Sequence, residues 1–250
     1  MATKQQIPVL AGAIVSKQEG FAALPDKDAQ WAIENTDEAI RLAVMAIQDR
    51  NFIKPRSNIQ VGIEDQLKLW QELYKLYFGL ENVKMINPER PNPSVRFKQL
   101  VVVAKGITLN DVIKAMRTTK MKIWSYSDDL NSAVATNERT ADKGHYAIYV
   151  RDTIEADEDL RDTSANEIAK KKTATMTLLE RLLLELFIFH WTGEHLDVKN
   201  VTLCAGSRDS VGGVPYVGWL AGRDRVRISW CYADDSSGNL RARAVHQFVG

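Results

Sequence analysis

In the first third of the chain, apolar residues recur at the three- and four-residue spacing of an amphipathic helix. Asp26 can cap a first helix within residues 26–50, whose apolar face carries Trp31, Ile40, Val44 and Ile47. A second helix is predicted over residues 63–78, because one face carries Ile63, Leu67, Trp70, Tyr74 and Tyr77. Gly79, which follows it, is typical of the residue that ends a helix.

A proline-rich segment, residues 87–93, interrupts this pattern. It holds three prolines, Pro88, Pro91 and Pro93. Proline neither continues a helix nor donates a hydrogen bond to a sheet, so the segment is predicted to be a rigid loop or linker. We therefore expect a helical N-terminal region over residues 1–86 and a second domain over residues 94–250.

The second domain is predicted to be rich in strands, because β-branched and aromatic residues cluster there in short runs. These runs cover residues 95–104, 121–126, 146–150, 201–205, 214–220 and 225–232. Thr108 or Asn110 can cap a short helix that ends at about residue 118. Residues 221–224 are typical of a hairpin turn between the last two strands.

A long, very apolar helix is predicted over about residues 173–191. Ser164 and Glu167 form a capping box before it, which opens either this helix or a separate one, and Gly193 ends it. Residues 178–189 are apolar almost all round, as is typical of a helix buried on most sides. The order of elements predicts an α+β fold in which a mixed β-sheet packs on this helix.

Glu185 lies inside that apolar helix, where an unpaired carboxylate is costly. Arg181 stands one turn earlier and can pair with it, as can an arginine from the last strands. Without such a partner, burial would raise the pKa of Glu185 and make it a candidate functional acid.

Composition and charge argue against several classes of protein, namely nucleic-acid coat proteins, disulfide-rich or zinc-bound proteins and membrane-spanning proteins. The 250 residues include 33 Lys and Arg and 32 Asp and Glu, so the net charge is +1, which argues against a dedicated nucleic-acid coat protein but not against a local basic patch. Two cysteines, Cys204 and Cys231, are too few for a disulfide framework or a zinc ligand set. No apolar run is long enough to span a bilayer, so we expect a soluble, cytoplasmic protein without a membrane partner.

After Lys199 the basic residues are all arginine, namely Arg208, Arg223, Arg225, Arg227, Arg241 and Arg243. Arg225 and Arg227 alternate with apolar residues, so both point to the same face of a strand. The planar guanidinium suits phosphate and carboxylate groups, which predicts an anion-binding strip with Trp219, Trp230 and Tyr232 as stacking platforms. The alternative is a polar sheet face held by Arg–Asp pairs.

A glycine-rich loop over residues 205–213 follows a predicted strand and is a second candidate for anion binding. Ser207, Arg208, Gly212 and Gly213 are its candidate binding residues, because such backbone can present N–H groups to an anion. The loop lacks the phosphate-loop motif and precedes a strand rather than a helix. The alternative is a flexible connection between two strands.

Acidic residues cluster after the strand at 146–150, and they are candidates for a Mg²⁺ site. The candidate ligands are Asp152, Glu155 and Asp157. Asp128 also follows a predicted strand, and it would converge with Asp152 if the strands at 121–126 and 146–150 were parallel neighbours. The alternative is a solvated loop.

Two hypotheses follow. The first is a non-catalytic binding or accessory protein that engages nucleic acid or a phosphate-containing ligand through the arginine-rich strands and the glycine-rich loop. The second is a metal-dependent hydrolase or nuclease with Mg²⁺ as cofactor, in which Asp128, Asp152 and Glu185 are the candidate catalytic residues. We favour the first, because no catalytic motif is present, and the sequence leaves open whether the protein is an enzyme.

Overall fold

A computed structural model describes residues 62–81, 83 and 97–247 of the chain. The chain divides into two compact units, Met1–Ile53 and Lys54–Gly250, and all described residues belong to the second. The predicted helix at 26–50 and the predicted boundary at 87–93 lie outside the described residues. The α+β class is confirmed, with the strands distributed over three sheets rather than one.

The first sheet is antiparallel and has the strand order β1-β4-β10. Its strands are β1 (Phe97–Val103), β4 (Tyr146–Arg151) and β10 (His246–Gln247). Consecutive residues of β1, from Gln99 to Val103, and of β4, from Ile148 to Val150, are buried, so both faces are covered there, which explains the continuous apolar runs in their sequences.

The second sheet is mixed and has the strand order β2-β8-β7-β5-β9, with β2 parallel to β8 and β5 parallel to β9. Its strands are β2 (Ile123–Ser125), β5 (Val201–Leu203), β7 (Val214–Leu220), β8 (Arg225–Cys231) and β9 (Leu240–Ala242). A third, two-stranded sheet joins β3 (Val134–Asn137) to β6 (Ser207–Asp209). Short elements complete the described chain, namely α7 (Leu130–Ala133), η1 (Glu158–Leu160) and η2 (Ala221–Arg223).

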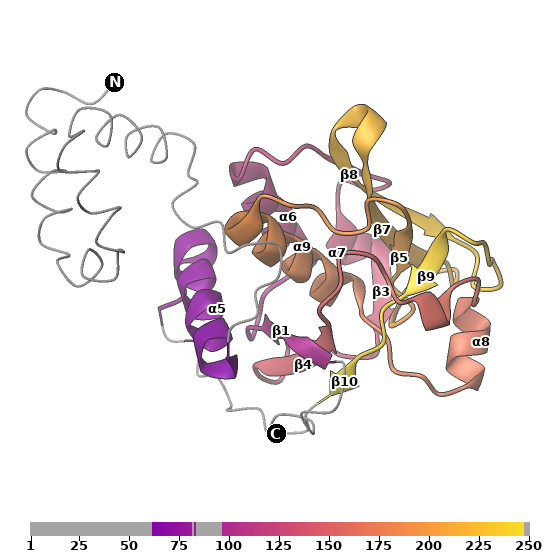
Figure 1. The fold of residues 1–250 in the computed structure, drawn as a ribbon, viewed down its shortest axis with the longest axis horizontal. Coiled ribbons are helices and arrows are strands. Elements are labelled where there is room, and N and C mark those ends of the chain that lie inside the picture. Colours follow the sequence, from indigo (N-terminus) through magenta and orange to yellow (C-terminus); the bar gives the residue numbers. More distant parts are fainter. Residues whose placement is uncertain (1–61, 82, 84–96, 248–250) are drawn as a thin grey trace, which may run out of the picture. The chain divides into compact units, whose positions relative to one another are not determined.

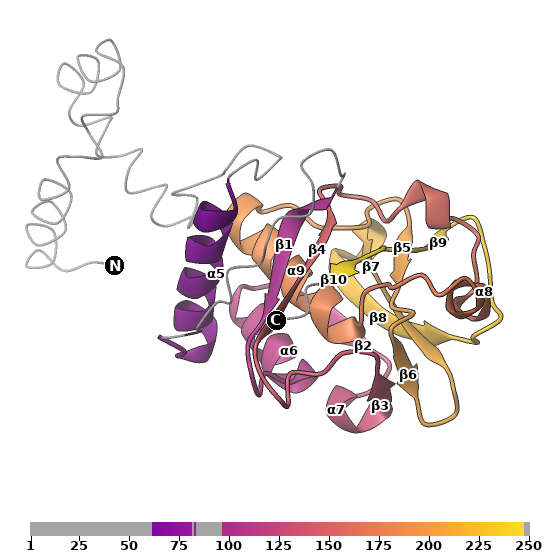
Figure 2. The same cartoon turned by 90° about the horizontal axis from the view of Figure 1, so that it is seen from below.

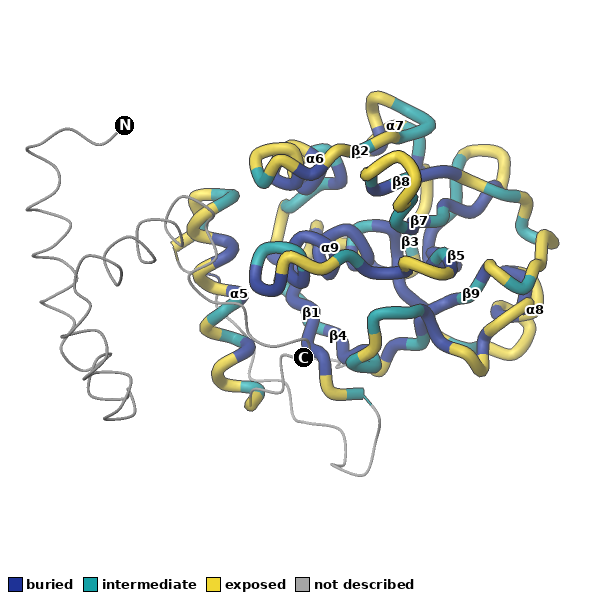
Figure 3. Tube along the Cα trace, turned by 45° about the horizontal axis from the view of Figure 1, so that its top comes forward, coloured by how far each residue is buried: buried dark blue, intermediate teal, exposed yellow. Residues whose placement is uncertain are grey.

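Helix α9 (Leu178–Thr192) lies between the two larger sheets and contacts both β1 and β7 (Figures 1 and 2). It begins at Thr177, whose side chain forms a capping box with Glu180, and ends at the left-handed Gly193. Figure 3 shows most of α9 buried, and helix α6 (Leu109–Thr118) packs alongside it. A helix buried on nearly every side must be apolar all round, as its sequence is.

The helix predicted from residue 173 therefore begins later, at Leu178. The capping box of Ser164 and Glu167 opens a separate helix, α8 (Ala165–Lys170). Lys172 adopts a left-handed backbone with φ 53°, which ends the helical path before α9 starts. No helix in the described part of the chain is both long and apolar enough to cross a membrane.

Helix α5 (Ile63–Phe78) matches the predicted bounds and covers the free edge of β1. Three side chains spaced four residues apart, Gln66, Trp70 and Tyr74, bond to the β1 backbone. Trp70 Nε1 donates to the Leu100 carbonyl at 3.0 Å, and the Tyr74 hydroxyl donates to the Val102 carbonyl at 2.7 Å. Four helical residues rise about 6 Å and two strand residues about 6.7 Å, so the two spacings match.

Candidate anion-binding face

The five-stranded sheet has one face in the core and one face that is only partly covered. Val217, Val226 and Ile228 point to the core that α9 occupies. On the other face, Ile168 of α8 packs with Leu203 and other residues at the β5 and β9 end of the sheet. The part of this face formed by β2, β8 and the adjoining half of β7 is partly exposed around Trp124, Arg225 and Arg227, and we call it the open face.

A row of alternating aromatic rings and guanidiniums lies on this open face. The parallel register pairs Trp124 with Arg227, and the Arg227 guanidinium carbon lies 5.5 Å from the Trp124 ring centre. The same carbon lies 5.7 Å from the ring of Tyr216, and the Arg225 guanidinium lies 5.7 Å from Trp124. We call Trp124, Tyr216, Arg225 and Arg227 the arginine–aromatic row.

The two arginines of the row have no acidic partner among the described residues. Trp124 is 38% exposed, and both arginines are half-buried. Lys122 pairs with Asp224 at 2.8 Å, and neither guanidinium of the row forms an ion pair within the described residues. The Nε atom of Arg225 is also buried without a hydrogen-bond partner. Cation–π contacts therefore hold both charges in place without neutralising them.

Two other arginines of the C-terminal segment form ion pairs within the fold. Arg241 pairs with Glu158, and the fully buried Arg243 pairs with Asp197 at 2.6 Å. Arg–carboxylate pairing, the alternative expected from sequence, thus accounts for these two but not for Arg225 and Arg227.

Arg208 lies on β6, where its Nη1 donates to the carbonyls of Ala205 and Ser207 at 2.6 and 2.8 Å. Burial lowers the pKa of Arg208 from its usual value, against the opposing effects of the Glu138 carboxylate and then of Cys231 at the end of β8. Cys231 shares the face of Arg225 and Arg227, because residues two apart on a strand point the same way. Arg208 thus lies near the far end of the row's strand.

The glycine-rich loop already holds a carboxylate of its own. Asp209 Oδ1 accepts hydrogen bonds from the Val211 and Gly213 amides at 2.9 and 2.6 Å, and a side chain on Gly213 would clash with this carboxyl group. The buried Ser207 donates to Asn137 and accepts from the Leu178 amide at the start of α9. These amides and this hydroxyl stabilise the fold and are not directed to an outside anion.

The aromatic residues expected as platforms lie elsewhere. Trp219 is on the core-facing side, where its ring stacks on His195 at 3.5 Å. Trp230 alternates onto the face opposite Arg227 and packs edge-on against Tyr232. Trp124 takes their place next to the arginines, and only the long-range pairing of β2 with β8 reveals this.

The candidate metal ligands are dispersed. Glu155 accepts from the Lys199 amide and from Asn200, and the buried Asp157 pairs with Arg151 at 2.9 Å. Asp128 follows β2 in the five-stranded sheet, whereas Asp152 follows β4 in the three-stranded sheet, so the two do not converge at one sheet edge. Within the described residues, no group of three or more His, Cys, Asp or Glu side chains is arranged to hold a metal ion.

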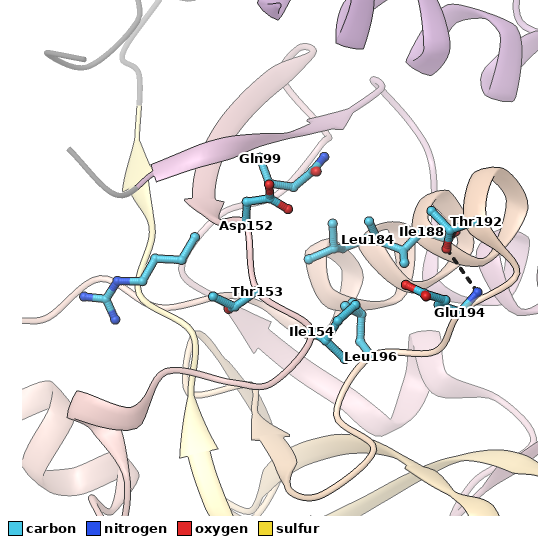
Figure 4. A pocket seen from close by; sticks show the side chains of 10 residues that line it. Gln99, Asp152, Thr153, Ile154, Leu184, Ile188, Thr192, Glu194 and Leu196 are labelled. Carbon is cyan, nitrogen blue, oxygen red and sulfur yellow. Dashed lines mark hydrogen bonds between the residues drawn. The ribbon is translucent and has the colours of Figure 1, made fainter. Parts of the chain in front are cut away.

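Asp152 instead lines a small cavity between the end of β4 and the C-terminal half of α9 (Figure 4). Leu184, Ile188 and other apolar residues form much of its wall, and Gln99 lies beside Asp152 with an unpartnered, buried Oε1 atom. Burial raises the pKa of Asp152. The cavity volume of about 20 Å³ is enough for a single water molecule, not for a substrate.

Glu185 is paired on both carboxylate oxygens. Arg181 donates to Oε2 at 2.8 Å, which confirms the predicted partner one turn earlier, and His195 Nδ1 lies 2.8 Å from Oε1. Arg181 also pairs with Asp197 at 2.8 Å, and Asp197 pairs with Arg243. We call these five residues the buried charge network.

The network perturbs the ionisation of its members. Burial by itself would raise the pKa of Asp197, but the guanidiniums of Arg243 and Arg181, helped by the Thr202 hydroxyl, outweigh it and hold this pKa below its usual range. His195 is held between the rings of Trp219 and Phe189, whose centres lie 3.5 and 4.6 Å away.

Cys204 is fully buried, and burial raises the pKa of its thiol, so it is not an activated nucleophile.

The chain matches no protein-family model, no curated protein and no solved structure. Its function is therefore inferred from the chemistry of its own side chains. The buried charge network satisfies its members internally, whereas the arginine–aromatic row presents unneutralised charge at the surface.

Proposed function

We propose that this protein binds a phosphate-bearing anionic partner on the open face of its five-stranded sheet. The observation that carries the proposal is the pair of guanidiniums, Arg225 and Arg227, that both lie over the ring of Trp124 without a carboxylate partner among the described residues. Two cations held by the same ring repel each other, so a bound anion is favoured there.

The chemistry of the side chains supports a phosphate rather than a small halide. Each guanidinium is planar and donates several hydrogen bonds in a fixed fork, which matches the oxygens of phosphate. Packing against Trp124 restricts both side chains, and Tyr216 restricts Arg227 further, so less conformational entropy is lost when an anion binds. The role is one of binding, because these groups include no nucleophile or general base.

The test compares two charge-matched double variants with the full-length parent. Arg225→Ala/Arg227→Ala removes the cations of the row, and Lys114→Ala/Arg117→Ala removes two exposed cations from α6. Binding to inorganic polyphosphate is measured by calorimetry at several salt concentrations. The row variant is expected to lose at least about tenfold in affinity and to reduce the slope of log K against log salt by about 1.4.

The α6 variant is expected to change the affinity less than about twofold, because only long-range screened electrostatics is altered. Equal losses in both variants would show that polyphosphate responds to net charge alone. That result, or the absence of any binding by the parent at low salt, would overturn the proposal.

A further inference from the structure

We infer that the partner is a single-stranded nucleic acid whose bases stack on the arginine–aromatic row. The inference rests on the proposed function, since the phosphates of the same strand would engage Arg225 and Arg227. What it adds is a role for the aromatic rings, which a purely anionic ligand would leave unused.

The geometry of the row is that of a stacking platform. Flat groups alternate across three neighbouring strands in the order Trp124 on β2, Arg227 on β8 and Tyr216 on β7, with the guanidinium within 5.7 Å of each ring. Bases stack on aromatic rings and on guanidinium planes alike. Trp124 is 38% exposed, a large apolar surface for a residue on a sheet face.

A path for the phosphates runs along β8 past the row. Arg225 and Arg227 mark its start. Arg208 lies on β6, which adjoins the start of β7, where Val214 pairs with Cys231 at the end of β8, and the Glu138 carboxylate partly offsets its charge. Six residue steps separate Arg225 from Cys231, a length of roughly 20 Å. A sheet face of this length, with two guanidiniums at one end and one near the other, fits a site for a few nucleotides.

A duplex suits this surface less well. Its bases are already stacked on each other and are read in grooves that admit a helix or a two-stranded ribbon. The row instead lies on the face of a sheet, and its rings need bases that are free to unstack. Strands β2, β8 and β7 lie side by side there, so the surface is broader than a ribbon.

The experiment uses the full-length protein and four fluorescein-labelled probes. These are a 12-nucleotide oligothymidine, its ribonucleotide counterpart, an abasic oligonucleotide of equal length and a duplex of equal length. The abasic strand keeps every phosphate and lacks the bases. Anisotropy titrations are expected to show that the oligothymidine and its ribonucleotide counterpart each bind about tenfold tighter than the abasic strand, because stacking adds to the affinity.

Three variants locate the stacking site. Trp124→Ala is expected to remove the advantage of normal over abasic strands while its abasic affinity stays within about twofold of the parent. Trp124→Phe, which keeps an aromatic ring, is expected to retain most of the advantage. Trp230→Ala removes a tryptophan of similar exposure, 40%, from the opposite face and is expected to change nothing. Circular dichroism verifies that each variant is folded, and Trp124→Phe remains the test if Trp124→Ala is not.

The outcomes distinguish base stacking on the row from anion binding by Arg225 and Arg227. Equal affinity of the parent for normal and abasic strands, or tighter binding of the duplex, would overturn base stacking while leaving anion binding intact. An advantage that survives in Trp124→Ala, or one that is lost in Trp124→Phe, would overturn the assignment to this row. Failure of the parent to bind any of the probes, together with no binding to polyphosphate, would overturn both.

Discussion

At the scale of single residues, the buried charge network shows how pairing offsets the desolvation cost of four charged side chains in the interior. Arg181, Glu185, Asp197 and Arg243 are each at most 1% exposed. Their formal charges cancel, and Asp197 accepts from both arginines and from Thr202. A buried ion pair adds little net stability compared with apolar residues, but removing one member leaves a charge uncompensated.

Asp197→Asn is therefore expected to lower the free energy of unfolding by about 3–5 kcal/mol, because Arg181 and Arg243 lose their shared carboxylate. Urea denaturation followed by circular dichroism measures the loss. Asp224→Asn is the control, since it breaks the exposed pair with Lys122, and a much smaller change is expected there because solvent screens that pair.

Asp197→Asn is also expected to change how the stability of the protein depends on pH. The folded-state pKa of Asp197 lies below its unfolded value, so its contribution is fully present above the unfolded pKa, near 4, and is lost as the pH falls through the lower folded pKa. The parent is thus expected to lose stability faster than Asp197→Asn as the pH falls below about 4. Parallel pH profiles would contradict the assigned ionisation.

At the scale of elements, α5 protects the edge of a sheet. The free edge of β1 would otherwise present unpaired backbone groups to another chain. The Tyr74 hydroxyl serves two of them, since it donates to the Val102 carbonyl and accepts from the Ala104 amide at 3.0 Å. Burial of this fully enclosed hydroxyl raises its pKa, so it stays protonated and keeps donating.

Tyr74→Phe is expected to destabilise the protein by about 1–3 kcal/mol, because a buried carbonyl and a buried amide lose their partner while the ring packing is kept. Tyr232→Phe applies the same change to a residue that is 65% exposed and is expected to cost under about 0.5 kcal/mol. Thermal and urea unfolding of both variants provide the comparison. A similar, small effect in both would show that α5 is not bonded to β1 as described.

At the scale of the whole molecule, one unit spans residues Lys54–Gly250, and side chains from distant segments hold it together. Arg243, which follows β9, donates to the carbonyls of Thr153 and Ile154, which follow β4. The network thereby connects the two larger sheets through α9. Residues 62–81 contribute to this unit through α5.

A shortened chain of residues 54–250 is expected to keep the fold, with an unfolding midpoint within about 3 °C of the full-length protein, because few contacts cross the boundary of a domain. A chain that starts at residue 97 lacks α5 and is expected to aggregate, since the β1 edge is then exposed. Differential scanning calorimetry and light scattering distinguish these results. A folded, monomeric 97–250 chain would contradict the role assigned to α5.

Local patterns in the sequence determined the elements of this protein. Apolar spacing and Gly79 predict α5, because helix formation depends on residues three and four apart. The Arg181–Glu185 pair is likewise predictable, since it lies within one helical turn. Strand alternation places Arg225 and Arg227 on one face for the same local reason.

Tertiary structure alone decided which of these elements meet. The pairing of β2 with β8 joins segments about a hundred residues apart, and it brings Trp124, not Trp219 or Trp230, to the two arginines. The tertiary structure also places Asp128 and Asp152 after strands of different sheets and brings His195 to Glu185 and Arg243 to Asp197 in the core. Strand pairing depends on the packing of whole sheets around α9, which no local period of the sequence encodes.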